Sequence, residues 1–154
     1  MFESREDAEK AIDRLHYDLD VDHDEISYIY RSTKGKKTAA AVGGTVGALA
    51  GIAGVIAAIP VIGPIVAAGP LAGALGLSGA VGATAGGAVV GAVSGGLIGA
   101  LVNMGIDEEY ARRYVDRVHA GHILVAVHSD NPTEVASLME EAGAEQINAY
   151  AVAV

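Results

Sequence analysis

Three histidines, His119, His122 and His128, lie close together near the end of the chain and could bind a metal through their ring nitrogens. Zinc sites built on histidine add cysteine or carboxylate ligands at fixed spacing. The chain has no cysteine, and no carboxylate near these histidines has such a spacing. His119 is also expected to end a helix and His122 to begin a strand. We therefore predict no metal site.

Aspartate occupies every second position from 18 to 24, as in a calcium-binding loop. The spacing then fails, because the sixth position counted from Asp20 is Glu25, not glycine, and the twelfth is Arg31, not glutamate. We interpret these acids as a solvated turn.

Hydroxyl groups at Ser78, Thr84 and Ser94 lie in an apolar segment without a neighbouring base, so no nucleophile can be assembled from them. No Gly-x-Gly-x-x-Gly motif stands between a strand and a helix. A net charge of -9 argues against binding to a phosphate backbone. We predict that the protein is not an enzyme, uses no cofactor and does not bind nucleic acid.

Charge divides the chain into three parts. The chain has 10 Lys and Arg and 19 Asp and Glu residues, and none of these 29 lies between residues 38 and 106, which hold 18 of the 21 glycines. Residues 1–37 and 107–154 are expected to form one α+β domain, interrupted by the uncharged insert 38–106. Because the chain opens without a basic and apolar leader, we expect the charged domain to stay in the cytoplasm.

The charged parts contain helix and strand patterns in alternation. We expect a helix from Ser4, with Ala8, Ala11, Ile12 and Leu15 facing inward, and a strand over Ile26–Tyr30. The second charged part predicts a helix from Asp107 to Gly121 with Tyr110, Ala111, Tyr114, Val115 and Val118 as its apolar stripe, a strand over Ile123–Val127, a helix from Asn131 to Gly143 and a last strand over Gln146–Val152.

This order fits a ferredoxin-like, split βαβ domain if a first strand precedes Ser4. Only Met1 and Phe2 are left to form it, so the first strand is short or missing. Either the start codon is misplaced, or the sheet is one strand short and another chain covers its exposed edge.

The insert has glycine at every fourth position in two places, which predicts two helices that pack closely as a glycine-zipper hairpin. The expected packing and oligomerisation positions are Gly43, Gly47, Gly51, Gly87, Gly91, Gly95 and Gly99. The helices are expected over about Ala39–Ile59 and Gly79–Asn103, with Pro60, Pro64 and Pro70 in the turn between them.

Each expected helix is about as long as a bilayer is thick. Basic residues at Arg31, Lys34, Lys36 and Lys37 precede the first helix, as the positive-inside tendency expects on the cytoplasmic side of a cell membrane. Membrane lipid would then be a partner. The alternative is a cytoplasmic, water-soluble homo-oligomer that buries its hairpins against one another.

Several of these segments resemble a bacterial family of general stress or heat-induced stress proteins of the YflT type, which has a glycine-rich insert. The resemblance lies at Phe2–Glu9, Gly63-Pro64, Gly69–Ala72, Gly105–Glu109 with Ala111 and Tyr114, Gly121, Ile123–Val125 and Gly143-Ala144. It implies a stress-linked protein with a ferredoxin-like domain and no catalytic residues.

Together these patterns predict a non-enzymatic, stress-associated protein that is anchored to the membrane and self-assembles through glycine-faced helices. The alternative is a soluble particle whose packed hairpins enclose an apolar ligand such as a lipid or a quinone. A ligand-sensing module is a third hypothesis, based on fold analogy alone.

Overall fold

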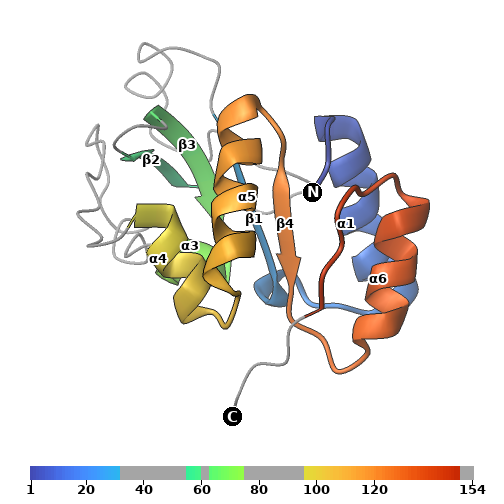
Figure 1. Cartoon of the computed structure of the whole chain (residues 1–154). Helices are drawn as coiled ribbons and strands as arrows, with labels where there is room; N and C mark the ends of the chain where they lie inside the picture. Colours follow the sequence, from blue (N-terminus) through green and yellow to red (C-terminus); the bar gives the residue numbers. More distant parts are fainter. Residues whose placement is uncertain (32–54, 60–62, 75–95, 150–154) are drawn as a thin grey trace.

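One four-stranded antiparallel sheet, with strand order β2-β3-β1-β4, forms the centre of an α+β fold (Figure 1). The computed structural model describes residues 1–31, 55–59, 63–74 and 96–149. Its elements are, in chain order, α1 (Arg5–Leu19), the short helix η1 (His23–Glu25), β1 (Ile26–Arg31), β2 (Val55–Ile59), β3 (Gly63–Ala68), α3 (Pro70–Ala74), α4 (Gly96–Asn103), α5 (Glu108–Ala120), β4 (Leu124–Val127) and α6 (Pro132–Glu141).

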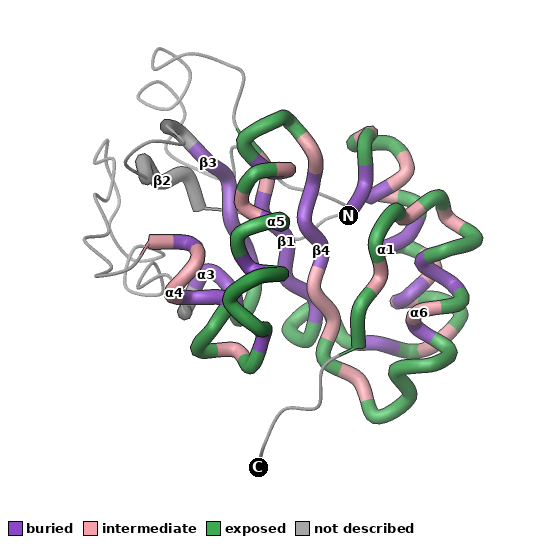
Figure 2. The backbone as a smooth tube through the Cα atoms, in the orientation of Figure 1, coloured by how far each residue is buried: buried purple, intermediate pink, exposed green. Residues whose placement is uncertain are grey.

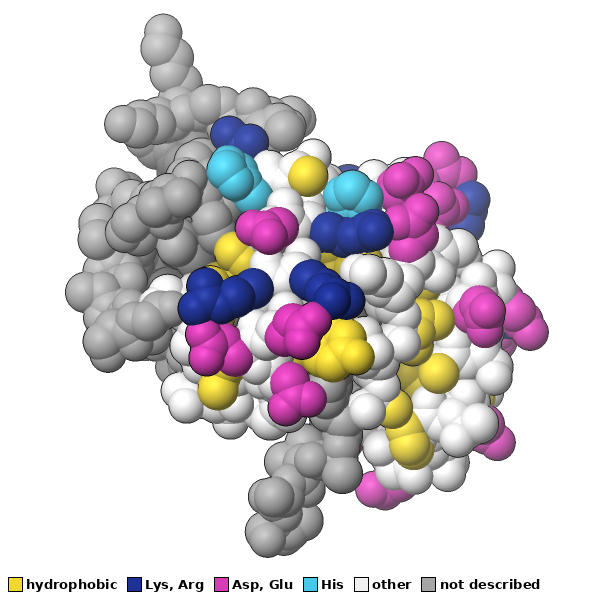
Figure 3. Space-filling view, in the orientation of Figure 1, with side chains coloured by type: hydrophobic (Ala, Val, Ile, Leu, Met, Phe, Trp, Pro, Cys, Tyr) yellow, Lys and Arg dark blue, Asp and Glu magenta, His cyan; other side chains and the backbone are white. Residues whose placement is uncertain are grey.

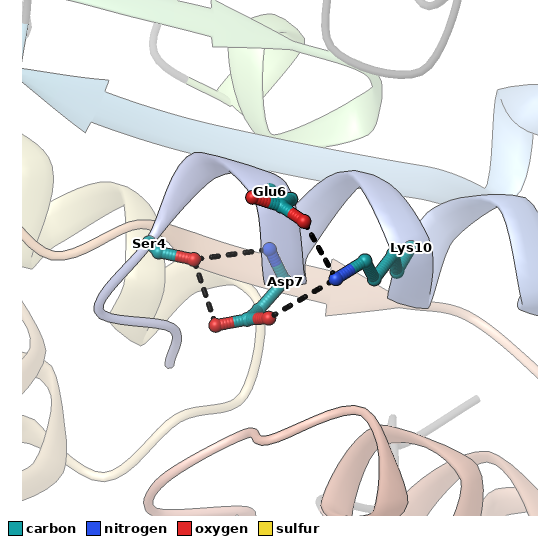
Figure 4. Close-up of polar contacts among 4 residues, drawn as sticks. All are labelled: Ser4, Glu6, Asp7 and Lys10. Atoms are coloured by element: carbon teal, nitrogen blue, oxygen red, sulfur yellow. Dashed lines mark hydrogen bonds and ion pairs between the residues drawn. The ribbon is translucent and has the colours of Figure 1, made fainter.

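Helix α1 begins where its capping residues predict. The Ser4 hydroxyl accepts a hydrogen bond from the Asp7 backbone N–H at 3.1 Å and donates one to the Asp7 carboxylate at 2.7 Å (Figure 4). Lys10 pairs with Glu6 at 2.8 Å on the next turn. Two acidic side chains in the first turn also favour the positive end of the helix dipole.

Most of β1, β3 from Ile65 onward and the first half of β4 are buried, as the purple parts of these strands in Figure 2 show. Side chains alternate along each strand, so Ile26 and Tyr28 of β1 pack on the side covered by α1 and α6, whereas Ile29 packs on the other side. We call the α1–α6 side the first face and the side covered by α3, α4 and α5 the second face. The inward residues predicted for α1 are all fully buried on the first face.

The uncharged segment differs most from its prediction. Residues Val55–Ile59, expected to end the first hairpin helix, form β2, so the helical prediction is wrong there, and Gly63–Ala68, expected in the turn between the helices, form β3. β3 pairs with β2 and also with β1, from Arg31↔Ile65 to Tyr28↔Ala68. β-branched residues favour strands, and the residue before a proline avoids the helical region.

The prolines of the expected turn do not lie together in one. Pro64 lies within β3, opposite Ala58 of β2 and one residue before the ladder with β1 begins, so its missing N–H costs no hydrogen bond to β1. Pro70 instead begins α3. Pro60 lies outside the described residues.

Gly69 joins β3 to α3 at a close approach to β1. Its φ is +73°, and a Cβ atom there would lie 2.3 Å from the carbonyl oxygen of Ile26, so only glycine fits. The turn brings the Leu71 backbone N–H to the buried hydroxyl of Ser27, which accepts it at 3.1 Å. This bond satisfies a donor at the start of α3 and fixes the helix on the second face.

Helices α4 and α5 complete the second face, with Leu97, Ala100 and Leu101 of α4 in the same apolar cluster as the inner side of α5. Helix α5 confirms its predicted start, its buried Ala111, Tyr114 and Val118, and its end at Gly121 with φ +108°. Tyr110 was expected to face inward but is 37% exposed.

The other predictions for the insert fall mostly outside the described residues. These are the packing glycines at 43, 47, 51, 87, 91 and 95 and the lysines at 34, 36 and 37, whereas Gly99 lies in α4 and Arg31 ends β1. Arg31 donates a hydrogen bond to the His119 carbonyl at 3.2 Å. Among the described residues, no helix combines the length and apolar composition that crossing a membrane requires.

The last part of the chain confirms β4 and α6 but not the last strand. Helix α6 follows Asn131 with Pro132 in its first turn and buries Val135, Leu138 and Met139 against the first face. Residues 146–149 form no strand, and residues 150–154 lie outside the described part.

Candidate functional site

The position expected for a first strand is filled by a single bridge. Phe2 pairs with Ile123 in antiparallel register, with its N–H donating to the Ile123 carbonyl at 2.9 Å and its carbonyl accepting at 2.8 Å. Phe2 is fully buried on the first face, and Met1 is buried on the second. On the side of β4 that faces away from β1, the described residues thus contribute a single bridge.

Beyond this bridge the outer edge of β4 has backbone groups without a strand to pair with. The His128 N–H donates to the Glu25 carbonyl on the side of β4 that faces β1. Ile123 bonds through its own N–H and C=O to Phe2 on the other side of β4. Because antiparallel strands alternate these directions, Val125 and Val127 direct both N–H and C=O away from β1. No strand lies on that side of either residue in the described part of the chain.

The segment that follows α6 runs beside β4 without pairing with it (Figure 1). It is held at its upper end by the Glu145 N–H, which donates to the Met1 carbonyl at 2.7 Å, and by an ion pair between Glu145 and Arg117 at 2.6 Å. Further on, the Asn148 amide donates to the Tyr114 hydroxyl at 2.5 Å. The segment is thus fixed at a distance from β4 by contacts with Met1 and α5.

A cavity of about 600 Å³ lies between β4 and this segment. Met104, Ile106 and Tyr114 line it on the second face, and Val135 and Met139 line it on the first. Figure 3 shows hydrophobic side chains gathered on this side of the molecule, between the charged surface of α5 and acidic groups beyond it. We call this cavity, bounded by Leu124–Val127 and Gln146–Ala149, the β4 slot.

The two ends of the slot differ in charge. Glu25 and Asp130 line the end that follows Val127, and no lysine or arginine is among the described lining residues. At the opposite end lies Met1, whose α-amino group has its pKa lowered from 8.0 to about 6, first by burial and then by the nearby Arg117 charge. The slot is therefore acidic at the end near Glu25 and Asp130, whereas at the Met1 end the amine is mostly uncharged at neutral pH and Arg117 is paired with Glu145.

One group of possible metal ligands lies at the Met1 end of the slot. Glu3, His122 and Glu145 place one ligand atom each within 4.8 Å of one another, the only such group among the described residues. His122 Nε2 is 3.7 Å from the Glu3 carboxylate, and Glu145 is already paired with Arg117. His119 and His128 are not in the group. The contacts by themselves describe an ion-pair network at the surface.

Comparison with protein-family models, curated proteins and solved structures gave no match. The resemblance to stress proteins therefore stays a prediction that depends on the residues quoted for it. The slot itself was not predicted as a site, since the sequence predicted only a first strand that is short or missing. The chain is an α+β protein.

Proposed function

We propose that the protein is a non-enzymatic interaction protein that accepts an extended strand of another polypeptide in the β4 slot. The outward N–H and C=O groups of Val125 and Val127 carry this proposal. Buried backbone groups without a partner are costly, and an added strand would pair with them. This function corresponds to the alternative in which another chain covers the edge of a sheet that is one strand short.

A ferredoxin-like plan for the charged parts supports the same reading. In such a plan the first strand lies between the third and fourth, and both helices cover one face. The Phe2–Ile123 bridge, the Glu145–Met1 bond and the packing of α1 beside α6 agree with that order. In this scheme β4 corresponds to the third strand of the ferredoxin-like plan, and the segment after α6 takes the place of the fourth strand. The slot is then the position that the remainder of the first strand would occupy.

An apolar small molecule is the second candidate, because the slot has the size of a ligand pocket and apolar walls on both faces. Such a ligand would leave the backbone groups of Val125 and Val127 unpaired, so we place it second. Organic extraction of the purified protein followed by mass spectrometry would detect it. Self-assembly through the glycine-faced helices and attachment to a membrane remain predictions about residues that lie mostly outside the described part.

The test titrates the isotopically labelled protein with a set of short extended peptides that differ in charge. At least one peptide should shift the amide resonances of Val125 and Val127 and slow their hydrogen exchange. Val127→Pro removes one outward N–H and should abolish this effect, whereas Val127→Ala keeps the N–H and should not. The proposal is wrong if no peptide protects these amides, or if both variants respond alike.

A further inference from the structure

The bridge at Phe2 determines the direction of an added strand. Phe2 runs antiparallel to β4 with its partner at Ile123, so Met1 takes the position opposite Leu124, and a strand that continues from there places its residues opposite Val125, Ala126 and Val127 in turn. Such a strand has its C-terminal end next to Met1 and its N-terminal end beyond Val127. Met1 closes the slot at the first of these ends, since it is itself buried there.

The groups at the two ends of the slot lie next to opposite ends of that strand. Glu25 and Asp130 lie where the strand enters with its N-terminal residues. Near its C-terminal end lie the Met1 amino group, which is mostly uncharged at neutral pH because its pKa is about 6, and Arg117, which is already paired with Glu145. The chain as a whole carries a net charge of -9, which attracts basic partners at long range. A basic residue is therefore favoured at the N-terminal end of the partner, beside Glu25 and Asp130.

The side chains that line the two faces of the β4 slot favour particular residue types in the middle of the added strand. Partners opposite Val125 and Val127 share their face of the sheet and meet Val135 and Met139 of α6. The partner opposite Ala126 faces the other side, toward Ile106 and Tyr114. Because neither wall offers a charged group, charged side chains there would be desolvated without compensation.

We propose that the partner is an extended peptide segment of another protein that runs antiparallel to β4, with lysine or arginine at its N-terminal end, near Glu25 and Asp130, and uncharged apolar residues along Val125–Val127. This inference depends on the proposed function and adds the direction and chemistry of the partner. A second copy of this chain and an apolar small molecule are the occupants that it excludes.

The experiment compares three N-acetylated, C-amidated peptides by titration calorimetry and by amide exchange at Val125 and Val127. The probe is Lys-Lys-Val-Ala-Val-Ala, the second peptide places the same two lysines at the C-terminal end, and the third replaces them with glutamate. The first should bind at least about fivefold more tightly than the other two, with an advantage that shrinks as salt is added.

Charge reversal in the protein gives the matched test. Asp130→Lys should lower the affinity for the lysine-first peptide by about tenfold and raise that for the glutamate peptide, because an attraction becomes a repulsion. Asp116→Lys, an exposed position on α5 outside the slot, makes the same change in net charge and should have little effect.

The outcomes separate the two proposals. If no peptide protects Val125 and Val127, the proposed function fails. If all three peptides bind equally well, or Asp130→Lys acts no more strongly than Asp116→Lys, strand acceptance stands and the charge rule is overturned. Protection of the same amides in the protein alone, increasing with its concentration, would identify a second copy as the occupant and would also overturn the inference.

Discussion

The two faces of the sheet are covered by helices of very different composition. On the first face, α1 and α6 carry charged residues outward and a few large apolar residues inward. On the second face, the amphipathic α5 is joined by α3, which contacts β1 and β3, and by α4, which contacts α5, and neither α3 nor α4 contains a charged residue. The first face is thus specified by amphipathic pattern alone, whereas the α3–α4 part of the second face depends on close approach of small residues and on a few fixed bonds.

This contrast predicts the largest effect at Gly69, where the second face is joined to β1. Gly69→Ala should lower the free energy of unfolding by about 4 kcal/mol, because a left-handed backbone strain and a collision with the Ile26 carbonyl each cost roughly 1–3 kcal/mol. Urea unfolding followed by circular dichroism measures the loss. Gly143→Ala is the control, since Gly143 has φ +93° but its added Cβ would be 3.9 Å from the nearest atom, Asp7 Cγ. Equal losses for both variants would show that the close approach to β1 is absent.

Truncation of one buried side chain on each face tests whether the faces are equally well packed. Ile12→Ala on α1 and Leu101→Ala on α4 should each cost roughly 3 kcal/mol, because both side chains are fully buried and leave a cavity. The same urea titration compares them directly. A large loss for Ile12→Ala with almost none for Leu101→Ala would mean that α4 does not pack on the second face in solution.

Consecutive residues at the start of the chain connect the faces, since Met1 packs on the second and Phe2 on the first. An unfolded chain protonates the Met1 amine below about pH 8, whereas the folded chain does so only below about pH 6. The unfolded state therefore binds more protons between pH 6 and pH 8. The free energy of unfolding should accordingly fall by roughly 2 kcal/mol as the pH falls from 8 to 6. Chemical acetylation of the amine should remove this part of the pH dependence. Parallel losses in the free and acetylated proteins would show that the amine is not buried.

The sequence predicts the elements of the charged parts of the chain better than those of the uncharged segment. α1, α5 and α6 were predicted because charged and apolar residues recur in them with a helical period, whereas β1 and β4 were predicted from short runs of β-branched, aromatic or apolar residues. Val55–Ile59 was predicted as the end of a helix because spacing of glycine by four was extended into a stretch where β-branched residues favour strands, and Gly63–Ala68 was predicted as part of the turn. No charged residue in that segment marks an outer face, so periodicity could not distinguish the alternatives.

The candidate site was predicted in part. The sequence predicted a first strand that is short or missing, and Phe2 makes a single bridge with Ile123 at that position. The acidic end of the slot could not be found in the same way, because Glu25 and Asp130 come from loops far apart in the sequence. Glu25 and Asp130 line the same end of the slot because β1 pairs with β4, and the local sequence pattern does not determine that pairing.

The smallest effect concerns the helix starts on the first face, where α1 and α6 both follow a residue that the sequence predicts as a cap. Ser4 makes its side-chain bond to the Asp7 N–H, whereas Asn131 makes no such bond. Ser4→Ala should therefore cost about 1 kcal/mol of stability and Asn131→Ala less than half of that.

Helix α6 has other stabilising features at its start, because Pro132 needs no hydrogen-bond acceptor and Glu134 lies in the first turn. Urea unfolding of the two variants gives the comparison, with Asp13→Ala on the exposed side of α1 as a control for loss of a polar side chain. A greater loss for Asn131→Ala than for Ser4→Ala would show that α6 depends on its predicted cap. The first face would then be fixed by sequence signals at both helices instead of at α1 alone.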